Sequence, residues 1–377
     1  MKRFSLSTML LLALIYTGAS CQNNKEITPE RPEQNPIRKD LISVRGQGIL
    51  FGHQDDLAYG VDWHYEEGGS DVKRVAGDFP ALFGWELGGL ERGDTHNLDS
   101  VPFEKMRDLA LKAHEMGGIN TFSWHPYEVI EGRSSWTRDA EIVKHILPGA
   151  AYHEAFKLQL DRVAQFLKSI KRIDGESIPF IFRPWHEMDG AWFWWGSEQC
   201  SPEEFQKLFA FTVNYLREEK GIQNMLVAYS PDRNFNSSDK YLTWYPGDGY
   251  VDILGVDNYH DLKQEQGYLE AIEKLHIVIA ESKKRNKLSA FTETGLENVT
   301  DTAWYPEMLG AVLEDSLVQK EISYVMVWRN DPKVHFFFPY PGHPAADGAK
   351  TLLERERIFL LSDYNEAKKK ARNTDGK

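Results

Sequence analysis

Residues Ile181–Gly196 read IFRPWHEMDGAWFWWG, which has the form of a buried strand that ends in a functional loop. The apolar beginning of this stretch predicts a strand over Pro179–Phe182. Arg183, His186 and Glu187 follow at once. A guanidinium, an imidazole and a carboxyl group therefore stand together where the strand ends.

Four consecutive aromatic residues complete the stretch: Trp192, Phe193, Trp194 and Trp195. Exposing this much aromatic surface is costly, so we expect the row to form a platform for a ligand. Sugars suit such a platform, because their C–H faces pack on indole rings while their hydroxyl groups pair with carboxylate, imidazole and guanidinium groups. The alternative interpretation is a buried aromatic core.

Eight short apolar runs of this kind predict strands at Gly48–Phe51, Pro80–Trp85, Ile119–Trp124, Pro179–Pro184, Met225–Tyr229, Ile253–Val256, Leu288–Thr292 and Ile322–Val327. Helical periodicity predicts helices between them at Phe103–Met116, Ala155–Lys171, Pro202–Lys220, Tyr268–Arg285 and Trp304–Leu317. Ser201 is the expected N-cap of the helix that begins at Pro202.

Strands that alternate with helices form a parallel sheet. Eight such units in one domain predict an α/β fold, a single (β/α)8 TIM barrel with the active site at the C-terminal ends of the strands. A doubly wound open sheet is the alternative. Against it, the segment Gly52–Asp56 (GHQDD) stands where that fold would carry a Gly-rich fingerprint.

The composition is that of a globular protein that binds a neutral ligand. The chain has 377 residues, a formal net charge of −13 and 12% aromatic residues, including 11 Trp. The negative charge disfavours nucleic acid as a partner, and the aromatic content fits contact with carbohydrate. We expect no metal, no organic cofactor and a monomer.

The N-terminus has the composition of an export signal. Lys2 and Arg3 precede the apolar run Met9–Ile15, and small residues lead to Cys21. Residues 1–20 are therefore a predicted signal peptide. The end of this signal resembles the lipobox of bacterial lipoproteins, although Gly18 stands where leucine is usual.

Acylation of Cys21 would make the protein an exported outer-membrane lipoprotein that faces the periplasm or the cell surface. The membrane would then be a partner only through this anchor. Residues 21–40 are polar and rich in proline, and we expect them to form a flexible tether. Cys200, the other cysteine, would have no disulfide partner.

Two predicted strand ends carry glutamates that could face each other across a bound sugar. Glu187 follows the fourth strand, and Glu293 follows the seventh within Ala290–Gly295 (AFTETG). Glycoside hydrolysis needs one protonated carboxyl group as the acid and one ionised carboxylate as the nucleophile or base. The sequence therefore predicts a glycoside hydrolase, with residues 41–377 as its catalytic (β/α)8 domain.

The motifs RPWHEMDGAWFWWG at 183–196, TETG at 292–295 and VWRN at 327–330 resemble glycoside hydrolase family 26. Members of that family are mostly β-mannanases on a clan A (β/α)8 barrel. The resemblance implies a retaining enzyme that cleaves β-1,4-mannosidic linkages by double displacement, with Glu187 as acid/base and Glu293 as nucleophile. The implied partner is a β-mannan polysaccharide or a manno-oligosaccharide.

The same resemblance implies substrate-binding roles for six further residues: His125, His186, Trp192, Tyr259, Trp328 and Arg329. Tyr259 is expected to donate a hydrogen bond to the nucleophile and so keep it ionised. Burial against Trp192 and the charge of the second carboxylate are expected to raise the pKa of Glu187. Asp189 stands where the family commonly has asparagine.

Other polar residues admit simpler interpretations than catalysis. His53, Asp55 and Asp56 could hold a metal, but we expect them to line the sugar-binding cleft. Trp63, His64 and Tyr65 would either line the cleft as well or serve only in packing. Glu86 and Glu128 are spare carboxylates without an aromatic frame. Asp232 and Asp257 are expected to give hydrogen-bonding support, and Cys200 has no histidine partner for nucleophilic catalysis.

Two alternative functions remain open at this point. A β-1,3-xylanase or a lichenase of the same family would use the same glutamates on a different glycan. A non-catalytic glycan-binding lipoprotein would use only the aromatic cleft. Loops at Asp56–Ser70 or Tyr127–Ala151 would decide between endo attack and release of mannobiose.

Overall fold

A computed structural model gives the fold of residues 34–138, 141–331, 333 and 335–375. The predicted signal peptide, Cys21 and residues 22–33 of the predicted tether lie outside these described residues. None of the helices in the described ranges is both long and apolar enough to cross a membrane.

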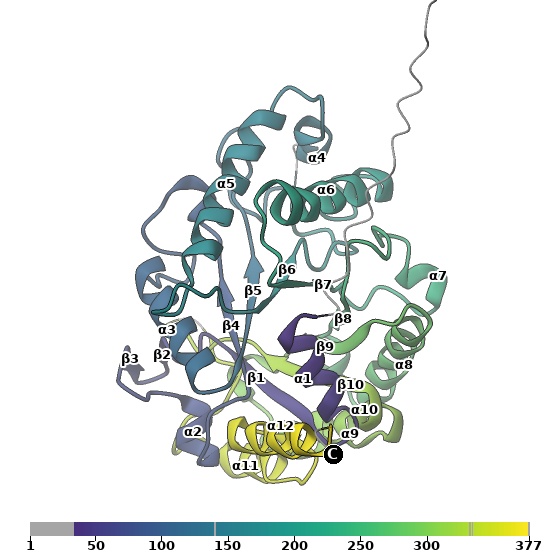
Figure 1. Ribbon diagram of the computed structural model, residues 1–377. Helices are drawn as coiled ribbons and strands as arrows, with labels where there is room; N and C mark the ends of the chain where they lie inside the picture. The colour runs from purple at the N-terminus through teal and green to yellow at the C-terminus, as the bar shows by residue number, and fades with distance from the viewer. Residues whose placement is uncertain (1–33, 139–140, 332, 334, 376–377) are drawn as a thin grey trace, which may run out of the picture.

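Eight parallel strands close into a barrel, which confirms the predicted fold class (Figure 1). Each strand pairs with the next in chain order, and the last pairs with the first. The strands are β1 Ile49–Gln54, β4 Leu82–Glu86, β5 Ile119–Trp124, β6 Phe180–Pro184, β7 Met225–Tyr229, β8 Ile253–Asp257, β9 Leu288–Thr294 and β10 Ile322–Val327. All their residues are buried, as expected for a parallel sheet covered on both faces.

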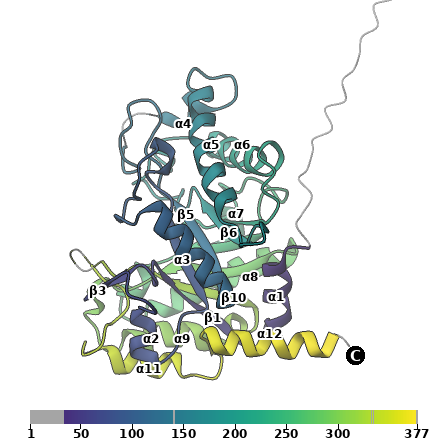
Figure 2. The same ribbon diagram turned by 60° about the vertical axis from the view of Figure 1, so that its left-hand side comes forward.

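Helices follow the strands and form the outer layer of the barrel (Figures 1 and 2). They are α2 Asp71–Ala76, α3 Phe103–Glu115, α4 Ile142–Ile146, α5 His153–Ser169, α6 Pro202–Asn214, α7 Ser238–Tyr241, α8 Tyr268–Lys284, α9 Gly310–Glu314, α10 Ser316–Glu321, α11 Ala346–Leu353 and α12 Leu361–Asp375. A small hairpin, β2 Tyr59–Gly60 and β3 Trp63–His64, follows β1, and the short strand β11, Ile358–Phe359, pairs with the start of β1.

The helix expected over Trp304–Leu317 is wrong as a single element. The chain forms a π-helical turn over Trp304–Leu309, continues as α9, and leaves helical geometry at Asp315 before α10 begins. Pro306 lies in the π-helical turn, where it cannot donate a backbone hydrogen bond. Asp315 then caps α10 by accepting hydrogen bonds from the backbone N–H groups of Leu317 and Val318.

The tether expected over residues 21–40 is wrong at its C-terminal end, because helix α1 occupies Pro36–Val44. The Asn35 side chain caps this helix, and proline stands in its first turn, where its missing N–H costs nothing. Ile37 and Leu41 are buried in a cluster that also holds Tyr364 of α12. Helix α1 is therefore part of the folded domain.

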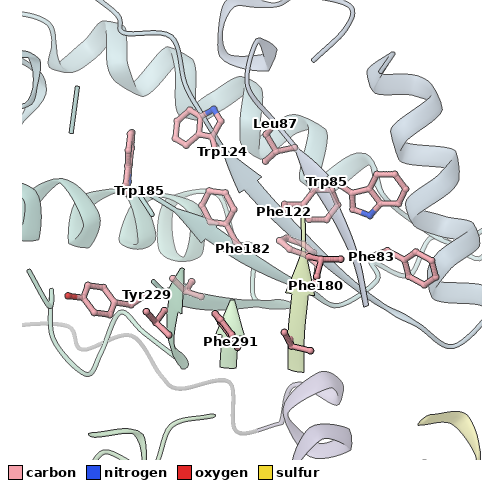
Figure 3. Packing of buried hydrophobic residues seen from close by; sticks show 14 of the residues in the cluster. Phe83, Trp85, Leu87, Phe122, Trp124, Phe180, Phe182, Trp185, Tyr229 and Phe291 are labelled. Carbon is pink, nitrogen blue, oxygen red and sulfur yellow. The ribbon is translucent and has the colours of Figure 1, made fainter. Parts of the chain in front are cut away.

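Strand residues alternate between the barrel interior and the layer beneath the helices. Figure 3 shows Phe180 and Phe182 of β6 in the outer cluster with Phe122 of β5, whereas Ile181 belongs to a smaller inner cluster. Arg183 is the next inward position of β6 and is only 1% exposed. The same alternation that packs the core thus places a guanidinium inside the barrel near its C-terminal end.

Candidate active site

A cleft of about 500 Å³ opens among the loops that follow the C-terminal ends of the strands. Seven of the eight residues predicted for the site line it: Glu187, Glu293, His125, Trp192, Tyr259, Trp328 and Arg329. His186 is buried behind this surface and contacts His125. The barrel therefore brings together residues that are separated by up to 204 positions, from His125 to Arg329.

Glu187 is held in place by an unusual backbone turn after β6. Both Trp185 and Glu187 have left-handed backbone angles, with φ of 54° and 55°, which residues other than glycine rarely adopt. The Glu187 N–H donates to the carbonyl of Ser230 after β7 at 2.8 Å. This turn presents the carboxyl group to the cleft instead of continuing the alternation of the strand.

The environment of Glu187 favours its protonated form. Burial raises its pKa well above the ordinary value, and the negative charges of Glu293, Asp257 and Asp232 raise it further. Trp192 opposes this shift by donating its indole N–H to Glu187 Oε2 at 2.7 Å. The net direction confirms the expectation that the pKa of Glu187 is raised, although Trp192 contributes a hydrogen bond to the carboxyl group as well as burial.

Glu293 reaches the cleft through an irregularity in β9. The pairing of β8 with β9 advances from Val256 opposite Phe291 to Asp257 opposite Glu293, so β9 carries one extra residue, Thr292. An extra residue of this kind reverses the side that the following side chain faces. The bulge therefore turns Glu293 from the helix layer toward the barrel mouth.

Two donors hold the Glu293 carboxylate. The Tyr259 hydroxyl donates to Oε1 at 2.5 Å, as the family resemblance implies, and the Arg183 guanidinium pairs with Oε2. Arg183 also donates to Asp257 Oδ2 at 2.5 Å, which confirms Asp257 as hydrogen-bonding support. Donors on both oxygens fix the orientation of the Glu293 carboxyl group at the barrel mouth.

A chain of hydrogen bonds runs from Glu86 through His125 to His186, the residue that precedes Glu187 in the sequence. His125 Nδ1 lies 2.7 Å from Glu86 Oε2, and His125 Nε2 lies 2.9 Å from His186 Nε2. Burial alone would raise the pKa of Glu86, but the His125 charge and hydrogen bonds from His125 and Ser123 hold it below its ordinary value. Burial and the nearby charge of Arg183 lower the pKa of His186, which favours a neutral imidazole there.

Trp328 and Arg329 form another part of the cleft wall. The Trp328 ring lies 6.0 Å from the His125 ring in an edge-on arrangement. Arg329 Nε pairs with Asp99 Oδ1 at 3.1 Å, and its Nη1 pairs with Asp331 Oδ2 at 2.7 Å. These carboxylates hold the guanidinium in one orientation at the cleft surface.

The expected four-residue aromatic platform is wrong for two of its members. Trp194 and Trp195 are 1% and 0% exposed, and their indole N–H groups donate to the carbonyls of Pro126 and His186. They belong to the core, as the alternative interpretation of the sequence proposed. Trp192 and Phe193 line the cleft.

Several residues of the site are not identifiable from the sequence, among them Arg183 and Trp136. The sequence places Arg183 at a strand end, but its pairing with Glu293 depends on the closure of the barrel. Trp136 is 50% exposed and lies parallel to the His125 ring, at 5.6 Å and 12°. An isolated tryptophan in a loop carries no local signal of function, although its exposed ring suits contact with a sugar face.

The expectation that His53, Asp55 and Asp56 line the cleft is wrong. All three side chains are buried, and they pair locally: His53 with Asp56 at 2.7 Å, and Asp55 with the Tyr59 hydroxyl at 2.7 Å. The described residues include no group of three or more His, Cys, Asp or Glu side chains that could hold a metal ion.

The neighbouring aromatic segment and the spare carboxylates also have structural roles. Trp63 is buried and donates to Asp71, and neither His64 nor Tyr65 lines the cleft. Glu128 is buried and accepts hydrogen bonds from the backbone of its own loop, including the N–H groups of Ile130 and Glu131.

Asp189 and Asp232 connect the loops after β6 and β7. The Asp189 carboxylate accepts hydrogen bonds from the backbone N–H groups of Asp232 at 2.6 Å and Asn234 at 3.0 Å. Burial and the charge of Asp232 raise the pKa of Asp189 to about 8. The residue that departs from the common family pattern thus fastens the loop that carries Glu187.

Known proteins resemble this chain in both sequence and fold. The model of glycosyl hydrolase family 26 matches residues 33–301. The mannan endo-1,4-β-mannosidase of Bifidobacterium adolescentis is 31% identical over 348 residues, which cover 87% of this chain and 34% of that protein. The mannan endo-1,4-β-mannosidase of Bacillus subtilis is 25% identical over 346 residues, which cover 86% of this chain and 88% of that protein.

Among solved structures, a family 26 β-mannanase from Bacteroides ovatus matches with a TM-score of 0.82 and 39% sequence identity. The match covers 88% of this chain and 94% of that one. The chain therefore spans about a third of the length of the Bifidobacterium protein but nearly the whole of the Bacteroides structure.

Proposed function

Because this chain belongs to glycosyl hydrolase family 26, we propose that it is a retaining mannan endo-1,4-β-mannosidase. Its substrates would be the β-1,4-mannosidic linkages of mannan, galactomannan, glucomannan or manno-oligosaccharides. The mannanases among its relatives support this substrate class.

The observation that carries the proposal is that two glutamates in one cleft have different environments. Burial and neighbouring negative charges favour a protonated Glu187, while the Glu293 carboxyl group accepts a hydrogen bond from Tyr259 and pairs with the Arg183 guanidinium. An acid and a carboxylate nucleophile are the two groups that a retaining glycosidase needs. A protein that only binds glycans would not need two glutamates in such different environments.

In the first step, the Glu293 carboxylate attacks the anomeric carbon while Glu187 donates its proton to the leaving glycosidic oxygen. The C–O bond to the leaving group breaks, and a covalent glycosyl-enzyme forms. Glu187, now ionised, takes a proton from water, which attacks the same carbon and releases Glu293. As the glycosyl ester forms, the Tyr259 and Arg183 donors lose their anionic partner, and they regain it on hydrolysis.

The remaining residues of the cleft would bind the sugar chain. We propose that Trp192, beside the acid, stacks on the sugar of the leaving group, and that Trp328 lies beneath the reacting sugar. Arg329, oriented by Asp99 and Asp331, would donate to hydroxyl groups of the next sugar. His125 would contact the reacting sugar, with Glu86 and the buried His186 holding its ring in place.

A product time course on linear β-1,4-mannan tests the proposal, with xylan and mixed-linkage glucan assayed in parallel. A ladder of manno-oligosaccharides would indicate endo attack, and mannobiose alone from the first minutes would indicate a cleft closed at one end. If products form only from xylan or glucan, the assignment of the two glutamates stands but mannan is not the substrate. Binding of mannan with no product would overturn catalysis.

Replacement of each glutamate tests their roles. We expect Glu187→Ala and Glu293→Ala each to lower kcat on mannan by about 10⁴-fold or more, because each removes a group that makes or breaks a bond. Circular dichroism should show an intact fold for both variants. Full activity in either variant would contradict the assignment.

A further inference from the structure

Another cavity, of about 480 Å³, lies at the opposite end of the barrel from the cleft. Its lining includes Gly117 and Gly118, which lead into β5, and Pro179, which precedes β6. It is therefore placed at the N-terminal ends of the strands. Its other lining residues come mainly from α1, α12 and the end of α3, and the proposed mechanism uses none of them.

Helices α1 and α12 pack on each other beside this cavity (Figure 2). Arg372 of α12 pairs with Asp40 of α1 at 2.9 Å, and apolar side chains of both helices share one buried cluster. The predicted tether leads directly into α1, so it joins the domain at this end of the barrel.

The two helices are basic in a strongly acidic chain. Residues 36–45 and 361–375 contain seven Lys or Arg and four Asp or Glu residues, which gives a net charge of +3, whereas the whole chain carries −13. Lys39, Arg45 and Lys369 are exposed. A basic surface of this kind attracts an anionic partner that the rest of the protein repels.

Lys368, which lines the cavity, is destabilised as a cation. Burial lowers its pKa to about 8, the charge of Asp40 opposes this shift, and the charge of Arg372 adds to it. The Lys368 ammonium donates to the Gly117 carbonyl at 2.7 Å, which uses one of its three N–H donors. An anion in the cavity would stabilise the charged ammonium and accept from its other donors.

Two isoleucines are exposed at the same end of the barrel. Ile42 of α1 is 45% exposed and stands three residues from both Lys39 and Arg45, so the three side chains share one face of the helix. Ile173 is fully exposed in the loop that leads from α5 into β6. Cations beside exposed apolar side chains are typical of a surface that lies in the interface of a membrane.

The cavity and the exposed residues around it form what we name the basal surface: Lys39, Ile42, Arg45, Ile173 and Lys369. We propose that the basal surface docks on the anionic phospholipids of a membrane, with a headgroup phosphate in the cavity beside Lys368 and Arg372. A domain docked in this way would present its cleft, at the opposite end of the barrel, away from the membrane. The inference depends neither on the mannanase function nor on acylation of Cys21.

Vesicle partitioning of the full chain tests this proposal, with Cys21→Ser in every protein so that no acyl group contributes. One set of vesicles is phosphatidylcholine alone, and the other is an equal mixture of phosphatidylcholine and phosphatidylglycerol. At low ionic strength we expect the partition coefficient on the mixed vesicles to exceed that on the neutral ones by about 30-fold or more. Added salt should reduce this difference, because it screens the attraction between exposed charges.

Charge reversal locates the contact. Lys39→Glu with Lys369→Glu should lower the partition coefficient on the mixed vesicles about 30-fold or more, because two attractive charges become repulsive. Lys144→Glu with Lys240→Glu is the matched control, since it changes the net charge equally at exposed residues that follow β5 and β7, at the cleft end. We expect it to remain within about twofold of the parent protein. All proteins share the same N-terminal residues, so these contribute equally to each.

Substitution of an exposed isoleucine tests the apolar contact. Ile173→Ser should weaken partitioning by about threefold, because an apolar side chain no longer enters the interface. Leu269→Ser is its control: Leu269 is 50% exposed at the start of α8, which follows β8 at the cleft end, and should have no effect.

Lys368→Gln tests the cavity itself. It removes one charge and retains an amide that can donate to the Gly117 carbonyl, so we expect partitioning to weaken about fivefold while circular dichroism shows an intact fold. Unchanged partitioning would overturn the cavity as the headgroup site.

Other results would overturn docking as a whole. These are equal partitioning of the parent protein on the two kinds of vesicle, or equal losses from the two charge reversals. Binding of inorganic phosphate in calorimetry without binding to mixed vesicles would also overturn it and indicate a small-anion site instead. In each of these cases the mannanase function stands, because mannan hydrolysis is measured without vesicles.

Discussion

The Tyr259 hydroxyl is one of two donors to Glu293, the proposed nucleophile, so its contribution can be isolated by a single substitution. Tyr259→Phe keeps the ring and removes the 2.5 Å hydrogen bond. A hydrogen bond to a charged group contributes about 1.5–3 kcal/mol, so we expect kcat/KM on mannan to fall roughly 10- to 100-fold.

Steady-state kinetics on mannan measures this effect, and Tyr245→Phe is the matched control. The Tyr245 hydroxyl also donates to a carboxylate, Asp248, at 2.9 Å, but neither residue lines the cleft. Wild-type kcat/KM for Tyr259→Phe would show that Arg183 alone suffices to hold the nucleophile.

Glu187 should influence stability in a pH-dependent way. Its pKa is raised in the folded state, so its contribution to the free energy of unfolding is fully present below the unfolded pKa of about 4.3 and is lost as pH rises through the folded pKa. Glu187→Gln does not titrate and keeps an oxygen that can accept from Trp192. We therefore expect its Tm, relative to wild type, to be higher at pH 9 than at pH 4.5 by about 2 °C or more.

Differential scanning calorimetry at the two pH values measures this difference. Glu198→Gln, which replaces an exposed glutamate, should give the same relative Tm at both. If the Tm of Glu187→Gln relative to wild type falls as pH rises, the folded protein does not disfavour the ionised form of Glu187.

At the scale of elements, local irregularities of two strands position the two proposed catalytic glutamates. The left-handed turn after β6 presents Glu187, and the bulge in β9 presents Glu293. Backbone distortions of this kind cost about 1–3 kcal/mol per strained residue and persist only where the surrounding structure enforces them. Here the Glu187 N–H bond to Ser230 and the pairing of β9 with both neighbours supply that enforcement.

Helix α6 begins just after the Glu187 loop and is fastened by a capping box. Ser201 Oγ accepts from the Glu204 N–H at 3.2 Å, and the Glu204 side chain accepts from the Ser201 N–H at 2.8 Å. Loss of such a cap costs about 1 kcal/mol, whereas glycine at the same position costs only a few tenths. We expect Ser201→Ala to lower Tm by about 1–3 °C and Ser201→Gly to lower it less.

Thermal unfolding monitored by circular dichroism compares the two Ser201 variants with wild type. If the alanine and glycine variants both melt with the wild type, the capping box does not contribute measurably to the stability of the domain.

At the scale of the whole molecule, the N-terminal sequence bears on where the protein is located in the cell. We propose that residues 1–20 direct export and that Cys21 is acylated, which would anchor the domain to a membrane through residues 22–34. The motif that supports this is the basic, apolar and small-residue order before Cys21. Metabolic labelling with radioactive palmitate in a bacterial host should label the wild type, and Cys21→Ser should lose the label.

Cys200→Ser is the control, because it removes the other cysteine and should keep the label. An unlabelled wild type, or equal labelling of Cys21→Ser, would contradict acylation at Cys21.

Much of the fold and the two central glutamates were predictable from local patterns. Apolar runs and helical periodicity are properties of short segments, so all eight barrel strands were placed to within a few residues. The failures were also local in origin. Trp304–Leu317 has helical periodicity throughout, but Pro306 and Asp315 interrupt it, and Pro36 starts a helix that the polar composition of residues 21–40 obscured.

The sequence by itself determined the alternation of strands and helices, the position of Glu187 and Glu293 at strand ends, and the aromatic character of the site. Only the tertiary structure decided which of those aromatic rings face the cleft, since Trp194 and Trp195 turn into the core while Trp136 comes in from another loop. It also decided that Arg183 pairs with Glu293, 110 residues away. The physical reason is that periodicity depends on neighbours in the chain, whereas contacts across a barrel depend on its closure and on the register of β6, β8 and β9.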